Sequence, residues 1–143
     1  MVIVMIIIAI IYSFAAPNLN RYNMRKAILN EAATLADVLE VTRSTATATH
    51  TNYKCVFDVP NNEYYYLPAD VLQKELHEDK IFRLDTGVVF ANAPAHITFS
   101  ATGRVAEPTG LTDPSVTLRA GKSGSITISV ARRTGRAEVG ALL

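Results

Sequence analysis

Hydrophobic residues fill the first sixteen positions of the chain almost without interruption. The segment Met1–Ala16, MVIVMIIIAIIYSFAA, holds nothing more polar than Tyr12 and Ser13. At a helical rise of 1.5 Å per residue it would cover only about 24 Å, a little less than a full membrane span. It also lacks the basic start and the small-residue cleavage site of a secretory signal. We therefore expect a membrane segment that lacks its first few residues, not a signal that is removed.

A helical pattern continues beyond Pro17. Apolar and small residues recur at steps of three and four, the spacing of one helical face: Met24, Ile28, Ala32, Leu35, Leu39, Thr42 and Ala46. Charged residues lie off this stripe: Arg21, Arg25, Glu31, Asp37, Glu40 and Arg43. Because a proline is tolerated inside a membrane-embedded helix, the pattern predicts one rod of roughly 45 residues and 70 Å, kinked near Pro17.

Strand signals replace the helical pattern after a Thr- and Ser-rich stretch at Thr42–Thr51, where we expect the helix to end. Tyr53–Val59 and Glu63–Leu67 flank Pro60-Asn61-Asn62 and predict a hairpin. The segment Ala69–Lys80 has helical spacing and predicts a short helix or an ordered loop. Further short runs predict strands at Ile81–Leu84, Val88–Phe90, His96–Ser100, Ser115–Leu118, Ser125–Val130 and Arg136–Val139.

These elements predict an α+β fold, in which a long N-terminal helix precedes an antiparallel β-sheet or β-sandwich domain. The expected organisation is a transmembrane or assembly half-helix at 1–17, an amphipathic half-helix at 18–50 and a globular β domain at 51–143. A soluble domain of this size has no use for so long a rod, whereas an assembly of several subunits does.

Composition and motifs give no sign of catalysis. The 14 Lys and Arg nearly balance the 13 Asp and Glu, and the single cysteine, Cys55, lies in an apolar run that predicts a small buried side chain. His50, His77 and His96 are scattered, and no phosphate-binding loop, nucleophile elbow or zinc motif is present. We therefore predict a protein that is not an enzyme and uses no metal, cofactor or small-molecule substrate.

A short basic cluster near the C-terminus leaves two interpretations open. Arg132, Arg133 and Arg136 lie in ARRTGRAEV, where they could contact DNA phosphates with strong salt dependence. The more common role of such residues is to solvate a sheet edge and discourage edge-to-edge pairing, and Glu138 weakens the positive potential.

The opening string IIIAIIYSFAAPNLNRY resembles the N-terminal helix of type IV pilins and of type II secretion pseudopilins. Later motifs resemble the minor pseudopilins and minor pilins of the GspH/FimT type. These motifs are Arg43-Ser44 late in the helix, HITFSATGR in mid-domain and a closing SITISV that is followed by Gly135-Arg136. The ordered set covers nearly the whole chain, although no single motif in it is specific.

The resemblance implies a structural subunit in the inner membrane, with its β domain in the periplasm or outside the cell. It would assemble with other pilin-like subunits through its apolar half-helix, and its partners would be those subunits and membrane lipid. The residues expected to mediate this are Val2, Ile3, Ile6, Ile7, Ile8, Ile10, Ile11, Phe14 and Pro17. The family's conserved glutamate would fall immediately before Met1, so an in-frame upstream Gly-Phe-Thr-Leu-Ile-Glu-like extension would support this resemblance.

Two alternatives remain. Some FimT-like minor pilins bind DNA through a Gly-Arg-rich C-terminal segment, which the basic cluster partly matches. A plain single-span membrane protein with a periplasmic β domain and no filament is the other.

Overall fold

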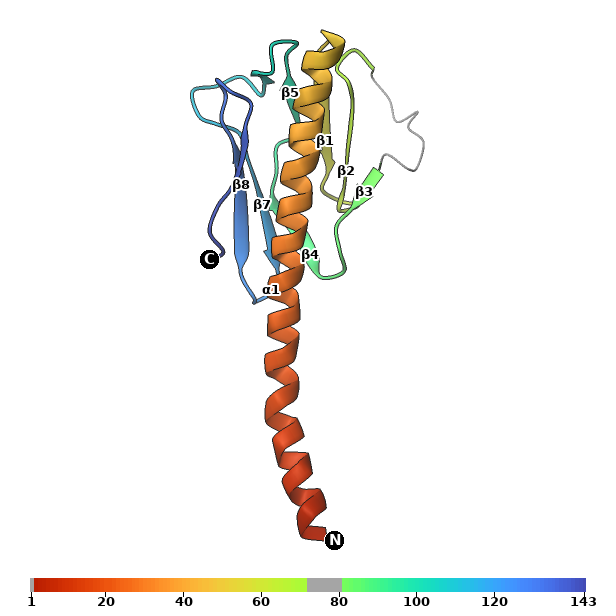
Figure 1. Ribbon diagram of the computed structural model, residues 1–143, viewed down its shortest axis with the longest axis vertical. Coiled ribbons are helices and arrows are strands. Elements are labelled where there is room, and N and C mark those ends of the chain that lie inside the picture. Colours follow the sequence, from red (N-terminus) through yellow and green to blue (C-terminus); the bar gives the residue numbers. More distant parts are fainter. Residues whose placement is uncertain (1, 72–80) are drawn as a thin grey trace.

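One helix dominates the structure. The computed structural model describes residues 2–71 and 81–143, of which residues 2, 3 and 6–19 are described by their backbone alone. Helix α1 (Val2–Thr49) contains 48 residues, which corresponds to about 70 Å. It continues through Pro17 without a break, and its red N-terminal part bends only gently (Figure 1). The predicted continuous rod is therefore confirmed.

The Thr-rich end of α1 stays helical because its hydroxyls bond back to the helix itself. The Oγ1 atoms of Thr42 and Thr45 donate to the carbonyls of Val38 and Val41, each at 2.7 Å. The helix ends one residue before His50, which adopts a left-handed φ of 54° and so cannot continue it. The end of the helix thus lies within the predicted Thr- and Ser-rich stretch.

The predicted apolar stripe faces the sheets along the C-terminal half of α1. Its members from Ile28 to Ala46 are all buried, and Met24 is half-buried at the point where the helix meets the β domain. Arg21, Arg25, Asp37 and Glu40 are exposed as expected, whereas Glu31 and Arg43 are partly buried.

Within residues 2–71 and 81–143, nine antiparallel strands form two sheets against this half of the helix. The five-stranded sheet has the order β3-β2-β1-β5-β6 and the four-stranded sheet has the order β4-β7-β8-β9. Their bounds are β1 Tyr53–Asp58, β2 Glu63–Pro68, β3 Ile81–Arg83, β4 Val88–Asn92, β5 His96–Phe99, β6 Val105–Glu107, β7 Ser115–Ala120, β8 Ser125–Val130 and β9 Ala137–Val139. In Figure 1 the upper half of α1 lies in front of the two sheets, with β1 to β3 on one side and β7 and β8 on the other.

The two sheets meet beneath the helix in one core. Phe90 of β4 contacts Phe57 of β1 and Tyr64 of β2 edge to face, with ring centroids 5.9 and 6.3 Å apart. Cys55 is wholly buried beside them, which confirms its predicted role as a small core residue, and burial raises the pKa of its thiol. The predicted α+β fold is confirmed, and the helix is part of the core of its β domain.

The strand predictions were nearly complete. The hairpin of β1 and β2 has the expected turn, and the other predicted strands are present. Strand β6 was not among them because it has only three residues and directly follows the Gly103-Arg104 turn. The short helix or loop predicted at Ala69–Lys80 lies mostly outside the described residues.

Candidate assembly surface

The N-terminal half of α1 projects beyond the β domain as a free rod (Figure 1). Residues 20–23 are exposed, and Ile28 is the first helix residue to be completely buried. Nearer the start of the rod, Val4 and Met5 are 57% and 74% exposed. The predicted assembly residues lie on the backbone of this projecting half: Val2, Ile3, Ile6, Ile7, Ile8, Ile10, Ile11, Phe14 and Pro17. The projecting backbone, together with the exposed Val4 and Met5, makes this half of the helix a candidate surface for other molecules.

Membrane crossing was a separate prediction for this half of the helix. Over the part of the chain that the structure describes, no helix combines the length and the apolar character that a membrane crossing requires.

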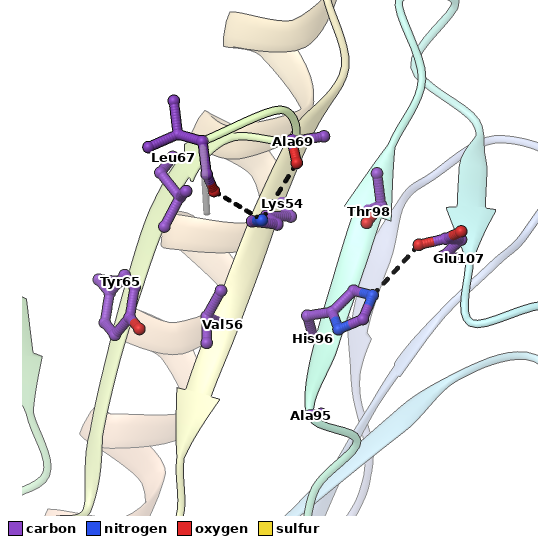
Figure 2. A pocket seen from close by; sticks show the side chains of 10 residues that line it. Lys54, Val56, Tyr65, Leu67, Ala69, Ala95, His96, Thr98 and Glu107 are labelled. Carbon is purple, nitrogen blue, oxygen red and sulfur yellow. Dashed lines mark hydrogen bonds and ion pairs between the residues drawn. The ribbon is translucent and has the colours of Figure 1, made fainter. Parts of the chain in front are cut away.

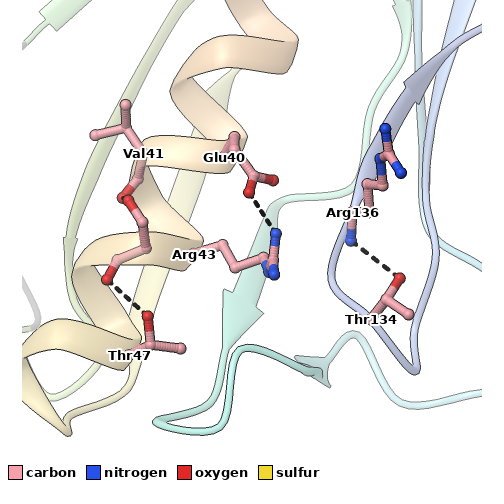
Figure 3. A network of polar contacts seen from close by, with 7 residues as sticks. Glu40, Val41, Arg43, Thr47, Thr134 and Arg136 are labelled. Carbon is pink, nitrogen blue, oxygen red and sulfur yellow. Dashed lines mark hydrogen bonds and ion pairs between the residues drawn. The ribbon is translucent and has the colours of Figure 1, made fainter.

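At the other end of the helix, the three motif fragments singled out in the sequence come together around Arg43. Figure 3 shows Arg43 on α1 facing the segment that carries Arg136. Gly103 and Gly135 each begin a Gly-Arg pair and have left-handed φ angles of 76° and 67°. A Cβ atom on Gly103 would lie 3.0 Å from Thr47 Cγ2 and 3.4 Å from Arg43 Nε. One on Gly135 would lie 2.9 Å from Arg43 Cδ and would collide with the Gly103 carbonyl oxygen. Both turns therefore require glycine, because they close against the helix and each other.

Arg43 is the centre of this junction. Its Nη1 donates to Glu40 Oε1 one turn earlier, while its Nε is buried without a hydrogen-bond partner among the described residues. Ser44 takes no part, since its hydroxyl is exposed and donates to the Val41 carbonyl at 3.0 Å. An open groove of about 510 Å³ runs beside the junction, between α1 and the start of β9.

The basic cluster of the C-terminal segment is divided between two roles. Arg132 is an internal clamp: its Nε donates to the Thr112 carbonyl at 2.6 Å and its Nη2 donates to the Pro108 carbonyl. These bonds tie both limbs of the β6–β7 loop to the β8–β9 turn. Arg133 and Arg136 are exposed. The structure therefore leaves two of the three predicted DNA contacts free, and DNA binding stays a prediction.

A second hollow, of about 490 Å³, lies on the face of the five-stranded sheet that points away from α1 (Figure 2). Its polar groups are already engaged. Lys54 Nζ donates to the carbonyls of Ala69 and Val71 at 3.1 and 2.8 Å, and His96 Nε2 lies 3.2 Å from Glu107 Oε2. Among the described residues, no three His, Cys, Asp or Glu side chains lie close enough to hold a metal ion.

Comparison with solved structures identifies proteins of the same architecture. The type IV minor pilin FimU of Pseudomonas aeruginosa superposes with a TM-score of 0.62 at 19% identity, over 84% of this chain and 92% of FimU. The minor pseudopilin EpsH of the type II secretion system of Vibrio cholerae superposes with a TM-score of 0.60 at 12% identity, over 82% of this chain and 96% of EpsH.

Sequence comparison is silent, because no protein-family model and no curated protein matches the chain. At identities this low, the structural likeness demonstrates a shared fold. The chain is therefore similar to minor pilins and minor pseudopilins in architecture, and the pilin-like fold implied by its sequence motifs is confirmed.

Proposed function

We propose that this protein is a structural subunit of a type IV pilus or of a type II secretion pseudopilus, of the minor pilin or minor pseudopilin kind. It assembles with other pilin-like subunits through the projecting half of α1. The observation that carries the proposal is a division within one helix. Its C-terminal half buries one face in the chain's own domain, whereas its N-terminal half projects beyond the domain, with Val4 and Met5 exposed.

The physical basis of assembly is lateral packing of the projecting rods. In a bilayer the surrounding lipid is as apolar as Ile or Val, so association must come from close van der Waals contact between helices. Once subunits leave the bilayer, burial of the same side chains among partner helices replaces burial in lipid. Before assembly we place the rod in the inner membrane and the β domain in the periplasm or outside the cell.

The test is a charged substitution in the projecting rod. Val4→Lys puts an ammonium into the helix bundle, where burying an unpaired charge is strongly unfavourable. We expect the variant to be lost from the filament fraction sheared from cells that make this protein. Val139→Lys is the matched control, since Val139 is 44% exposed on β9, far from the rod. Retention of Val4→Lys in filaments at the wild-type level would contradict the proposal.

The same fractionation distinguishes the proposed filament subunit from the single-span alternative. A wild-type chain that stays entirely in the membrane fraction, in cells that make filaments, would be a plain anchored protein. Recovery of the chain in filaments together with other pilin-like subunits supports the proposal instead.

A further inference from the structure

The proximal end of the β domain, where the helix emerges, carries a ring of basic side chains. Three of them, Arg21, Arg25 and Lys26, follow the apolar stretch of α1 directly, and all three are exposed. Two more come from the other side of the chain, Arg119 at the end of β7 and Lys122 in the β7–β8 turn, and both are exposed. We refer to these five residues as the basic collar.

Tertiary contacts bring the two parts of the collar to one level. A Cβ atom on Gly87 would lie 2.7 Å from Met24 Cε, so the start of β4 touches the helix there. In the β4–β7 ladder Val88 pairs with Ala120 and Val89 pairs with Arg119. The end of β7 and the turn after it therefore lie at about the level of Met24, at the end of the β domain from which the helix emerges (Figure 1).

The collar is electrostatically unsatisfied within the chain. Across residues 20–71 and 81–143, none of its five side chains has an ion-pair or hydrogen-bond partner. Two acidic residues described at this end are Glu31 of α1 and Asp85 of the β3–β4 turn, and the Asp85 carboxylate accepts the Thr86 N–H at 2.8 Å. Farther up the helix the exposed charges change sign, at Asp37 and Glu40. Positive charge is thus concentrated next to the apolar half of the rod.

We propose that the basic collar binds the anionic headgroups of the membrane and sets the depth at which the helix sits. This inference rests on the proposed membrane residence of the rod. Arg21 to Lys26 span about 8 Å of helix, comparable with the roughly 5–8 Å depth of the headgroup layer on one side of a bilayer. Long basic side chains at this position reach the headgroups while their stems follow the apolar surface. Lys122 and Arg119 extend the contact from the helix to the β domain.

The experiment measures binding of the full-length protein to phosphatidylcholine vesicles and to vesicles in which 30% phosphatidylglycerol replaces phosphatidylcholine. Flotation at limiting lipid gives two binding constants, and their ratio reports headgroup recognition. Each basic residue at an anionic surface contributes a factor of about five, so the five residues of the collar should give the wild type a ratio on the order of 1,000 in low salt. It should fall steeply as salt is added.

Substitutions locate the effect. Arg21→Gln/Arg25→Gln/Lys26→Gln should reduce the ratio about 100-fold, to about 25, and Lys122→Gln alone should reduce it about fivefold. Arg133→Gln/Arg136→Gln removes two exposed charges at the opposite end of the domain and should leave the ratio unchanged. Thermal unfolding of each variant in nonionic detergent shows that the β domain stays folded.

The outcomes distinguish headgroup binding by the basic collar from membrane insertion of the apolar rod. A wild-type ratio near one contradicts headgroup binding by the basic collar. An unchanged ratio in the triple variant contradicts it as well. Binding to phosphatidylcholine vesicles reports the apolar rod alone, so its absence counts against the proposed membrane residence even where the ratio is high. Absence of binding to both kinds of vesicle overturns both.

Discussion

The roles of individual polar residues in this protein depend on the contacts that they make in the folded chain. Arg132 and Arg133 are neighbours of identical chemistry, yet one clamps two carbonyls and the other is exposed. Glu31 lies on α1 beside the β3–β4 turn, where the backbone N–H of Asp85 is near its carboxylate. Partial burial raises the pKa of Glu31, and the nearby Asp85 charge adds to this, while the Asp85 N–H opposes it.

Replacing Glu31 tests this assignment. A raised pKa means that the folded state favours the protonated carboxyl, so the ionised group costs stability as pH rises through its folded pKa. Glu31→Gln keeps an oxygen to accept the Asp85 N–H and removes the charge. We expect a higher unfolding temperature than wild type at pH 7 and little difference near pH 4, measured in nonionic detergent. The exposed Glu138→Gln serves as the control, and an equal gain at both pH values would contradict the assignment.

At the scale of elements, the two Gly-Arg turns end separate hairpins but form one joint. The Gly103 turn connects β5 to β6 and the Gly135 turn connects β8 to β9, one from each sheet. They are held against each other by the Val105 N–H, which donates to the Arg132 carbonyl at 3.1 Å. This joint closes the two sheets over the end of α1, at the side opposite the Phe57–Phe90 contact.

The joint predicts unequal costs for two glycine substitutions. Gly135→Ala places a Cβ in a left-handed residue and against the Gly103 carbonyl, so we expect a loss of roughly 2–5 kcal/mol of unfolding free energy. Gly121→Ala has the same kind of backbone, with φ of 50°, but nothing lies within 4 Å of the added atom. It should cost only about 1–2 kcal/mol. Equal losses of unfolding free energy for the two variants, measured by urea denaturation, would contradict a steric collision between the Cβ added at Gly135 and the Gly103 carbonyl.

At the scale of the whole molecule, one helix serves two environments. Its C-terminal half completes the core of both sheets, through residues such as Leu35 and Leu39 that are completely buried. Its N-terminal half projects beyond the domain (Figure 1), and Val4 and Met5 are exposed there.

Truncation of Leu35 tests the dependence of the domain on its helix. Leu35→Ala opens a cavity between α1 and the sheets and should reduce the unfolding free energy by about 2–5 kcal/mol. Leu29→Ala lies on the exposed side of the same helix, where Leu is 46% exposed, and should change it by no more than about 0.5 kcal/mol. A loss below about 1 kcal/mol for Leu35→Ala, measured by urea denaturation, would argue that the β domain is stable without the helix.

Local periodicity in the sequence is enough to predict much of this structure. The spacing of Met24 to Ala46 determined which face of the helix is buried, and alternation within short segments determined most strands, since both patterns reflect backbone geometry over a few residues. The order of the two Gly-Arg turns further indicated a pilin-like domain, and the shared architecture with FimU and EpsH confirms that fold.

Tertiary structure alone decided which distant residues meet. Arg43, Gly103 and Gly135 lie tens of residues apart in sequence, and only the closure of both sheets over α1 makes them neighbours. The same holds for Arg132, which became a loop clamp, and for Lys122, which joined Arg25 and Lys26 at one end of the domain. Sequence patterns report the face on which a side chain lies, whereas its partners depend on how whole elements pack.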